Sequence, residues 1–155
     1  MKITELTSFS HEEFLQIRQL MSELDNSLPF TEQQLENVVN APTCHLLVMR
    51  DATDTIIGTC TLCLFYSPTG SKISVEDVVI APAFQGQHLG RQLMEYALQY
   101  INSWRPVTIQ LTSRPARKAA NRLYQSLGFQ QKETNVYHME MKSQKGKTSW
   151  GVKMH

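Results

Sequence analysis

Apolar residues recur at helical spacing in four segments of the chain. The first two segments each follow a capping-box pattern, in which Ser or Thr precedes Glu or Gln by three positions. Ser10 with Glu13 therefore predicts one helix start, and Thr31 with Gln34 predicts another. We expect the first helix to end at the polar turn 25–27, because short polar side chains compete for backbone hydrogen bonds. Two helices thus precede the main sheet.

Two further helices are predicted in the second half of the chain. The first covers residues 89–103, where leucine, alanine and tyrosine recur on one face. The second lies around residues 120–127 and is followed by Gly128, the residue type commonest at a left-handed helix cap. Both helices are amphipathic, so each should pack one face against a sheet.

Between the helices the period changes to that of β-strands. Segments rich in Val, Ile, Leu and Thr, many of them alternating apolar with polar residues, predict strands at residues 3–6, 44–50, 55–66, 72–80, 107–111, 129–133 and 136–141. The resulting order is β-α-α-β-β-β-α-β-α-β-β. We therefore expect an α/β (α+β) fold with a mixed, mostly antiparallel central sheet flanked by helices.

The length of 155 residues suits one domain, and no linker-like stretch divides the chain. We expect a single domain at 1–142 and a mobile tail at 143–155, which is lysine-rich and lacks a clear period. The net charge of +1 gives no general attraction to nucleic acid or to an anionic membrane. The longest apolar-leaning run, 56–66, is too short to span a bilayer. The simplest expectation is a soluble cytoplasmic protein that binds neither nucleic acid nor a membrane.

Cys44, Cys60 and Cys63 make an odd count, which fits a reducing compartment better than a disulfide framework. Cys60 and Cys63 form a C-x-x-C pattern. In a strand, however, positions three apart point to opposite faces of the sheet, so these thiols are poorly placed to share a metal. We interpret them as small apolar core residues and expect no bound metal.

The most informative segment is a strand at 73–80, a loop with two glycines at 85–91, and the helix that begins at Leu89. Glycines allow a close backbone approach to an anion, and the first N–H groups of a helix have no partners within the helix. By itself a loop with two glycines is weak evidence for a phosphate site over a plain tight connection, and the flanking strand and helix strengthen the phosphate interpretation. The loop lacks the Gly-Lys-Ser/Thr ending of a Walker loop and the glycine spacing of a dinucleotide-binding fingerprint.

The loop Gln85-Gly86-Gln87-His88-Leu89-Gly90 resembles the pyrophosphate loop of the GNAT acetyltransferase superfamily, Gln/Arg-x-x-Gly-x-Gly/Ala, with His88 in a usual glycine position. Residues 119–129 resemble the superfamily's Asn-x-x-x-x-Tyr-x-x-x-Gly-Phe helix, although Asn121 here lies three residues before Tyr124. Two motifs at the expected separation are more specific than either one. The resemblance spans about 73–141.

The resemblance implies acetyl-CoA as acetyl donor and a primary amine as acceptor. It implies that the backbone of Val78, Val79 and Ile80 binds the pantetheine arm and the acetyl carbonyl. It also implies that the pyrophosphate is held by Gln85, Gly86, Gln87, His88, Leu89, Gly90 and Arg91. Asn121 would contact the cofactor, or would be only a polar residue on the helix surface. His88 and Arg91 would contact phosphate, or only solvent.

Tyr124 matches the superfamily's general acid, which protonates the leaving thiolate; the alternative is that it only packs beside Leu123. Glu76 is the candidate base by resemblance, because it lies two residues before Val78 on the strand where some members of the superfamily carry a catalytic glutamate. Alternation places Glu76 and Val78 on the same face of the sheet. The alternative is a solvated or ion-paired carboxylate that only positions substrate. Asp77 is expected to point the other way and to be structural.

Two other classes of function stay open, namely an acyl-CoA-binding sensor without turnover and a protein-interaction module. The acceptor amine is not identified by the sequence; its specificity should come from the turn at 25–30, the sheet near Glu76, and residues around Arg114 and Tyr137. Many relatives dimerise through sheet edges, and the predicted closing strand at 136–141 offers such an edge for a homodimer.

Overall fold

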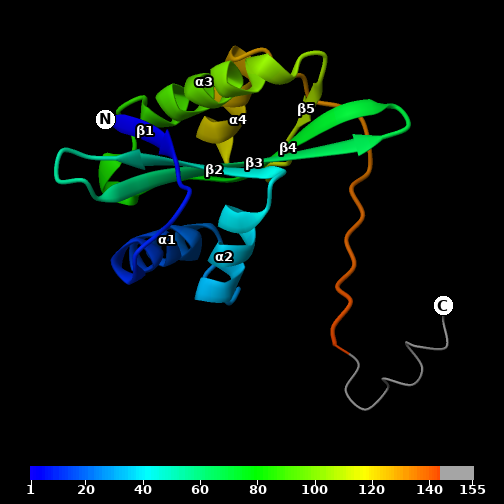
Figure 1. Ribbon diagram of the computed structural model, residues 1–155. Helices are drawn as coiled ribbons and strands as arrows, with labels where there is room; N and C mark the ends of the chain where they lie inside the picture. Colours follow the sequence, from blue (N-terminus) through cyan, green and yellow to red (C-terminus); the bar gives the residue numbers. More distant parts are fainter. Residues whose placement is uncertain (144–155) are drawn as a thin grey trace.

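The computed structural model describes residues 1–143, which build a five-stranded sheet with helices on both faces (Figure 1). Helices α1 and α2 cover one face, and α3 and α4 cover the other. The strands are β1 (Lys2–Glu5), β2 (Cys44–Arg50), β3 (Ile56–Ser67), β4 (Gly70–Ile80) and β5 (Thr108–Gln110). The helices are α1 (His11–Leu24), α2 (Glu32–Asn40), α3 (Leu89–Ile101) and α4 (Lys118–Ser126), with 3-10 turns at Pro82–Phe84 and Asn102–Trp104.

Both predicted capping boxes are formed. The Ser10 hydroxyl accepts a hydrogen bond from the Glu13 N–H at 3.1 Å, and the Glu13 carboxylate accepts one from the Ser10 N–H at 2.9 Å. Thr31 and Gln34 make the same reciprocal pair at the start of α2. Each box satisfies two backbone donors of an otherwise unpartnered first turn, which is why both starts could be read from sequence.

The sheet order is β1-β2-β3-β4-β5. The first four strands pair antiparallel, and β4 pairs parallel with β5, so the predicted mixed, mostly antiparallel sheet is confirmed. The sheet separates two apolar clusters. One lies under α3 and α4 and includes Leu47, Leu62, Leu93 and Met94; the other lies under α1 and α2.

A β-bulge interrupts β4 where the sequence predicted regular alternation. Thr59 pairs with Val79 and Thr61 pairs with Glu76, so β4 carries one more residue than β3 in this interval. Asp77 takes the left-handed φ of 52°, and its carbonyl accepts a hydrogen bond from the Thr59 hydroxyl at 3.2 Å. The extra residue shifts the later side chains of β4 to the other face.

Strands β4 and β5 separate early. They pair only from Lys72–Thr108 to Ser74–Gln110, after which β4 continues for six residues with no strand on its β5 side. An unpaired backbone edge needs other partners for its N–H and C=O groups. This separation is the feature of the fold that defines the site described below.

The two predicted closing strands are not formed. Residues 130–143 have no regular secondary structure and run away from the body of the molecule (Figure 1). The apolar side chains of this segment, which we call the C-terminal arm, are strongly exposed; they are Val136, Tyr137, Met139 and Met141, at 72–89%. Alternation alone cannot make a strand, because a strand needs a partner for its backbone.

The expected tail at 143–155 falls, apart from Ser143, outside the described residues, and a single domain at 1–142 stays a prediction. Of the helices in residues 1–143, none has the length and apolar character needed to cross a membrane.

Candidate functional site

The loop between β4 and α3 has the geometry of an anion cradle. Gly86 and His88 both take left-handed φ angles, 79° and 60°, so the chain turns twice before α3 begins at Leu89. Residues 85–88 are all exposed, and no side chain caps the helix. The first backbone N–H groups of α3 therefore lie open at the positive end of the helix dipole.

The start of α3 packs closely against α4. A Cβ atom on Gly90 would lie 3.5 Å from Leu123 of α4, and the Arg91 guanidinium donates a hydrogen bond to the Ser126 hydroxyl. Leu89 is buried in the core, so it can offer the loop only its backbone. The two sequence motifs thus lie side by side in the structure.

The β4 backbone next to this loop is the second part of the site. Val78 and Ile80 pack against the cluster under α3 and α4, whereas Val79 packs on the other face. The Gln85 side-chain amide donates to the Ile80 carbonyl at 3.0 Å and ties the loop to the end of the strand. Because β5 has already separated, the outer edge of this stretch is free of strand pairing.

Tyr124 of α4 is 6% exposed and packs edge-on against Phe129, with ring centroids 6.0 Å apart. Burial raises the pKa of its hydroxyl, and the positive charge of Arg117 offsets part of that rise. Tyr124 therefore keeps its proton throughout the neutral range. A buried phenol that stays protonated can donate a hydrogen bond or a proton.

The β4 bulge changes the expected arrangement of the carboxylates. Glu76 faces the α1 and α2 side, where it accepts a hydrogen bond from the Ser74 hydroxyl at 2.9 Å. Val78 packs on the α3 side, so the prediction that these two residues share one face is wrong. Desolvation, together with the negative charge of Glu76, raises the pKa of the neighbouring Asp77.

Arg117 is a further candidate site residue, which the sequence did not indicate. It lies in the loop before α4, and its guanidinium donates to the Val78 carbonyl at 3.4 Å. That carbonyl is on the stretch of β4 that β5 leaves unpaired. Asn121, the predicted cofactor contact, donates its amide to the Arg114 carbonyl at 3.1 Å and so orders the same loop. No spacing or composition marks Arg117, because only the tertiary structure brings it to β4.

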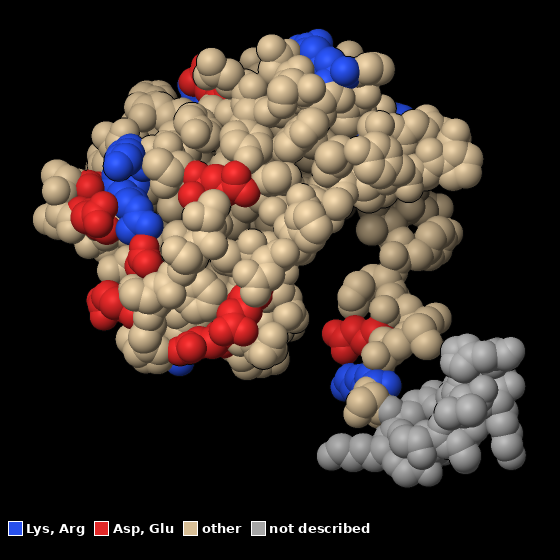
Figure 2. All heavy atoms as spheres, viewed as in Figure 1, with Lys and Arg blue, Asp and Glu red and all other residues tan. Residues whose placement is uncertain are grey.

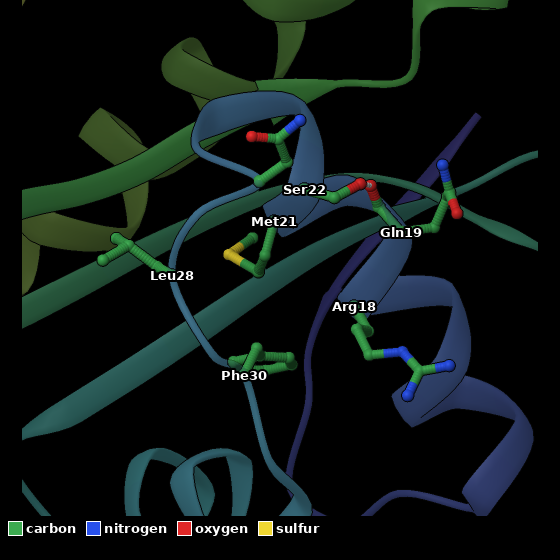
Figure 3. A pocket seen from close by; sticks show the side chains of 7 residues that line it. Arg18, Gln19, Met21, Ser22, Leu28 and Phe30 are labelled. Carbon is green, nitrogen blue, oxygen red and sulfur yellow. Dashed lines mark hydrogen bonds between the residues drawn. The ribbon is translucent and has the colours of Figure 1, made fainter.

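The turn between α1 and α2 borders two open cavities. One, of about 260 Å³, is lined by Arg18, Gln19, Met21, Ser22, Asn26, Leu28 and Phe30 (Figure 3). The other, of about 340 Å³, lies between the end of α1 and Arg114. Hydrogen bonds from Ser27, with a smaller effect of Arg114, lower the pKa of Asp25 at this second cavity. Arg114 thus lies beside the turn, whereas Tyr137 lies on the exposed C-terminal arm.

Acidic side chains gather over α1 and α2, in the lower part of Figure 2. Both helices have glutamates in the first turn and no basic residue in the last. Within residues 1–143, no group of three or more metal-binding side chains comes together. The arrangement combines an anion cradle, a free strand edge, a protonated phenol and exposed carboxylates, which suits transfer of an acyl group from a phosphate-bearing thioester.

Comparison with known proteins agrees with this geometry. The family model of the acetyltransferase (GNAT) family matches residues 7–129. No curated protein sequence matches the chain significantly.

Similar solved structures include an acetyltransferase from Trypanosoma brucei, with a TM-score of 0.73 and 20% identity over 90% of this chain and 99% of that one. An aminoglycoside acetyltransferase from an uncultured soil metagenomic sample has a TM-score of 0.75 and 17% identity over 92% and 96%. Glucosamine-6-phosphate N-acetyltransferase from Arabidopsis thaliana has a TM-score of 0.72 and 20% identity over 89% and 97%. At identities of 17–20% the similarity to these structures shows the fold alone. The family itself is shown by the family model, which covers most of the chain. This protein belongs to the GNAT family of acetyltransferases.

Proposed function

We propose that this protein transfers an acetyl group from acetyl-CoA to a primary amine by direct attack of the amine on the thioester. The observation that carries the proposal is the early separation of β4 from β5 beside the open N-terminus of α3. An extended amide-containing arm can bond the free strand edge, and its pyrophosphate can reach the cradle. Acetyl-CoA has both parts, and it supplies the acetyl thioester.

The cofactor side uses mainly backbone groups. Val78, Val79 and Ile80 would bond the pantetheine arm and the acetyl carbonyl, and the loop 85–91 would hold the pyrophosphate. Arg117 already bonds the Val78 carbonyl, so its guanidinium lies where it can contact the cofactor or exchange with it. Asn121 would act at the same end by holding the loop that carries Arg117 in place.

Tyr124 is the proposed general acid. When the nitrogen–carbon bond forms and the carbon–sulfur bond breaks, the departing thiolate needs a proton. The raised pKa of Tyr124 keeps that proton available at neutral pH. Because the ring packs against Phe129, the hydroxyl oxygen is held in position before the substrates bind.

Glu76 is the proposed base, acting directly or through water on the proton of the attacking amine. Most alkylammonium groups are protonated at neutral pH, since their pKa is about 10.4. Glu76 is exposed on the face that carries α1 and α2, and its bond with Ser74 fixes the carboxylate. The amine would therefore approach from the side of the α1–α2 turn, where acidic residues favour a positively charged acceptor.

The main alternative is an acyl-CoA-binding sensor without turnover. It would be favoured if Glu76 were tied up in an ion pair or if the acceptor side were closed. Within residues 1–143, the salt bridges are those of Glu5, Glu13, Glu32 and Asp54, and Glu76 takes part in none. The α1–α2 turn borders open cavities. Both observations favour catalysis over sensing.

The deciding experiment measures release of free CoA thiol from acetyl-CoA across a broad panel of amines, with Tyr124→Phe beside the wild type. We expect at least one amine to give turnover that the variant loses. Binding of acetyl-CoA in a parallel titration without turnover on any amine would instead favour the sensor.

We also propose a cytoplasmic homodimer. All three thiols are free, which suits a reducing compartment. The closing strands predicted from sequence are not formed, so we assign the dimer contact to the C-terminal arm, whose four large apolar side chains are exposed. Sedimentation of the wild type and of Met139→Lys tests this: the wild type should sediment as a dimer and the variant as a monomer. A monomeric wild type would contradict the proposal.

A further inference from the structure

Two of the three cysteines face each other across neighbouring strands. Cys44 of β2 is the register partner of Cys63 of β3, and their Sγ atoms lie 3.9 Å apart. The next pair along, Thr43 and Leu64, is joined by a backbone hydrogen bond of 2.8 Å. Pairs alternate along an antiparallel ladder, so Cys44 and Cys63 form a non-hydrogen-bonded pair.

This position has the geometry that a disulfide needs. In a non-hydrogen-bonded pair the Cα atoms are about 4.5 Å apart, which lies within the range of about 4.4–6.8 Å found in disulfides. Closing the gap between the sulfur atoms requires only small side-chain rotations, because the Cα atoms of such a pair are already within the disulfide range.

The third cysteine is excluded from the pair. Cys60 is fully buried in the cluster under α3, on the opposite face of the sheet. Cys44 and Cys63 are each half-buried, so a small solute can reach them. The C-x-x-C pattern in the sequence therefore points to the wrong partner for Cys63, whose true partner lies nineteen residues earlier in the chain.

The pair also lies close to the carboxylates of the candidate site. Cys63 is the register partner of Ser74, whose hydroxyl bonds Glu76. Burial raises the pKa of the Cys63 thiol to about 12, with further contributions from Cys44, Glu76 and Asp77. Cys63 thus stays protonated at neutral pH.

We propose that Cys44 and Cys63 form a redox-active dithiol that hydrogen peroxide oxidises to a cross-strand disulfide. The thiolate is the reactive form of cysteine, and Cys63 is held as a thiol, so Cys44 reacts first. A sulfur–oxygen bond forms on Cys44, the oxygen–oxygen bond breaks, and water leaves. The Cys63 sulfur then attacks the Cys44 sulfur, loses its proton, and displaces a second water. The two thiols lose two electrons and two protons, and peroxide is reduced to two waters. A small-molecule dithiol such as dithiothreitol reverses the change.

The test counts thiols in the native full-length chain and does not depend on acetyl transfer. The protein is treated with hydrogen peroxide, quenched, denatured, and labelled with a maleimide before peptide mass spectrometry. We expect the three reactive thiols to fall to one, at Cys60, with a mass loss of about 2 Da and a peptide cross-link between Cys44 and Cys63. Dithiothreitol should restore all three.

Two variants serve as controls. Cys60→Ser should keep the same cross-link, whereas Cys44→Ser should form no intramolecular disulfide. The proposal is overturned if peroxide leaves the three thiols free, if it drives Cys44 to the sulfinic acid without a cross-link, or if the cross-link joins Cys60 to Cys63.

Discussion

Replacing Tyr124 with Phe removes one hydroxyl from the candidate site and leaves the packing in place. The ring stays against Phe129, and none of the hydrogen bonds within residues 1–143 uses the Tyr124 hydroxyl. A fully buried hydroxyl without a hydrogen-bond partner is found at Ser113 and not at Tyr124, so the Tyr124 hydroxyl reaches the surface. The free energy of unfolding should therefore change by less than about 1 kcal/mol.

Turnover should respond much more strongly than stability. A positioned general acid contributes about 100-fold to 10,000-fold, or roughly 3–5 kcal/mol of activation free energy. We expect kcat for CoA release to fall by that factor, while the KM for acetyl-CoA changes little because the cofactor contacts are mainly backbone.

The pH dependence gives a second readout of the same substitution. The pKa of Tyr124 is raised by burial, so the protonated acid should persist up to and above pH 10, the ordinary pKa of tyrosine. Wild-type kcat should fall above that pH, and the variant should lack this alkaline limb. Tyr96→Phe, on α3 in the same cluster, is the matched control and should keep wild-type turnover. If Tyr124→Phe retains turnover within about threefold, Tyr124 is only a packing residue.

Three further predictions follow from local geometry. His88→Gly should raise the free energy of unfolding by about 0.5–1 kcal/mol, because His88 holds a φ of 60° that glycine adopts without strain; a lower urea midpoint would contradict this. Glu76→Gln should lower kcat by at least about 100-fold, and the control Asp77→Asn should lower it less. A larger fall in kcat for Asp77→Asn than for Glu76→Gln would make Asp77 the base. The hydrogen bond from the Ser10 backbone N–H, and then Arg50, lowers the pKa of Glu13. Its contribution to the free energy of unfolding is therefore present above the unfolded pKa of about 4.3 and is lost as pH falls through the lower, folded pKa. Glu13→Gln should therefore flatten the acid limb of the stability curve measured by circular dichroism, and an unchanged limb would refute the assignment.

The local sequence determined the elements whose chemistry is local. Both capping boxes are satisfied within four residues, and Gly128 takes the left-handed φ of 102° just beyond α4, as its position predicted. The glycine loop and the start of α3 are likewise a short-range pattern. These features need no distant partner, so the sequence was sufficient to place them.

The tertiary structure decided what depends on a partner from elsewhere in the chain. The C-terminal arm alternates apolar and polar residues as a strand does, but it has no neighbouring strand to pair with. The bulge at Asp77 moved Val78 to the face opposite Glu76, because a single extra residue reverses a period of two. Cys44 met Cys63, and Arg117 met the Val78 carbonyl, only because strand register and loop path brought them together. Register and loop path are set by the summed packing of both sheet faces, which no short window of sequence contains.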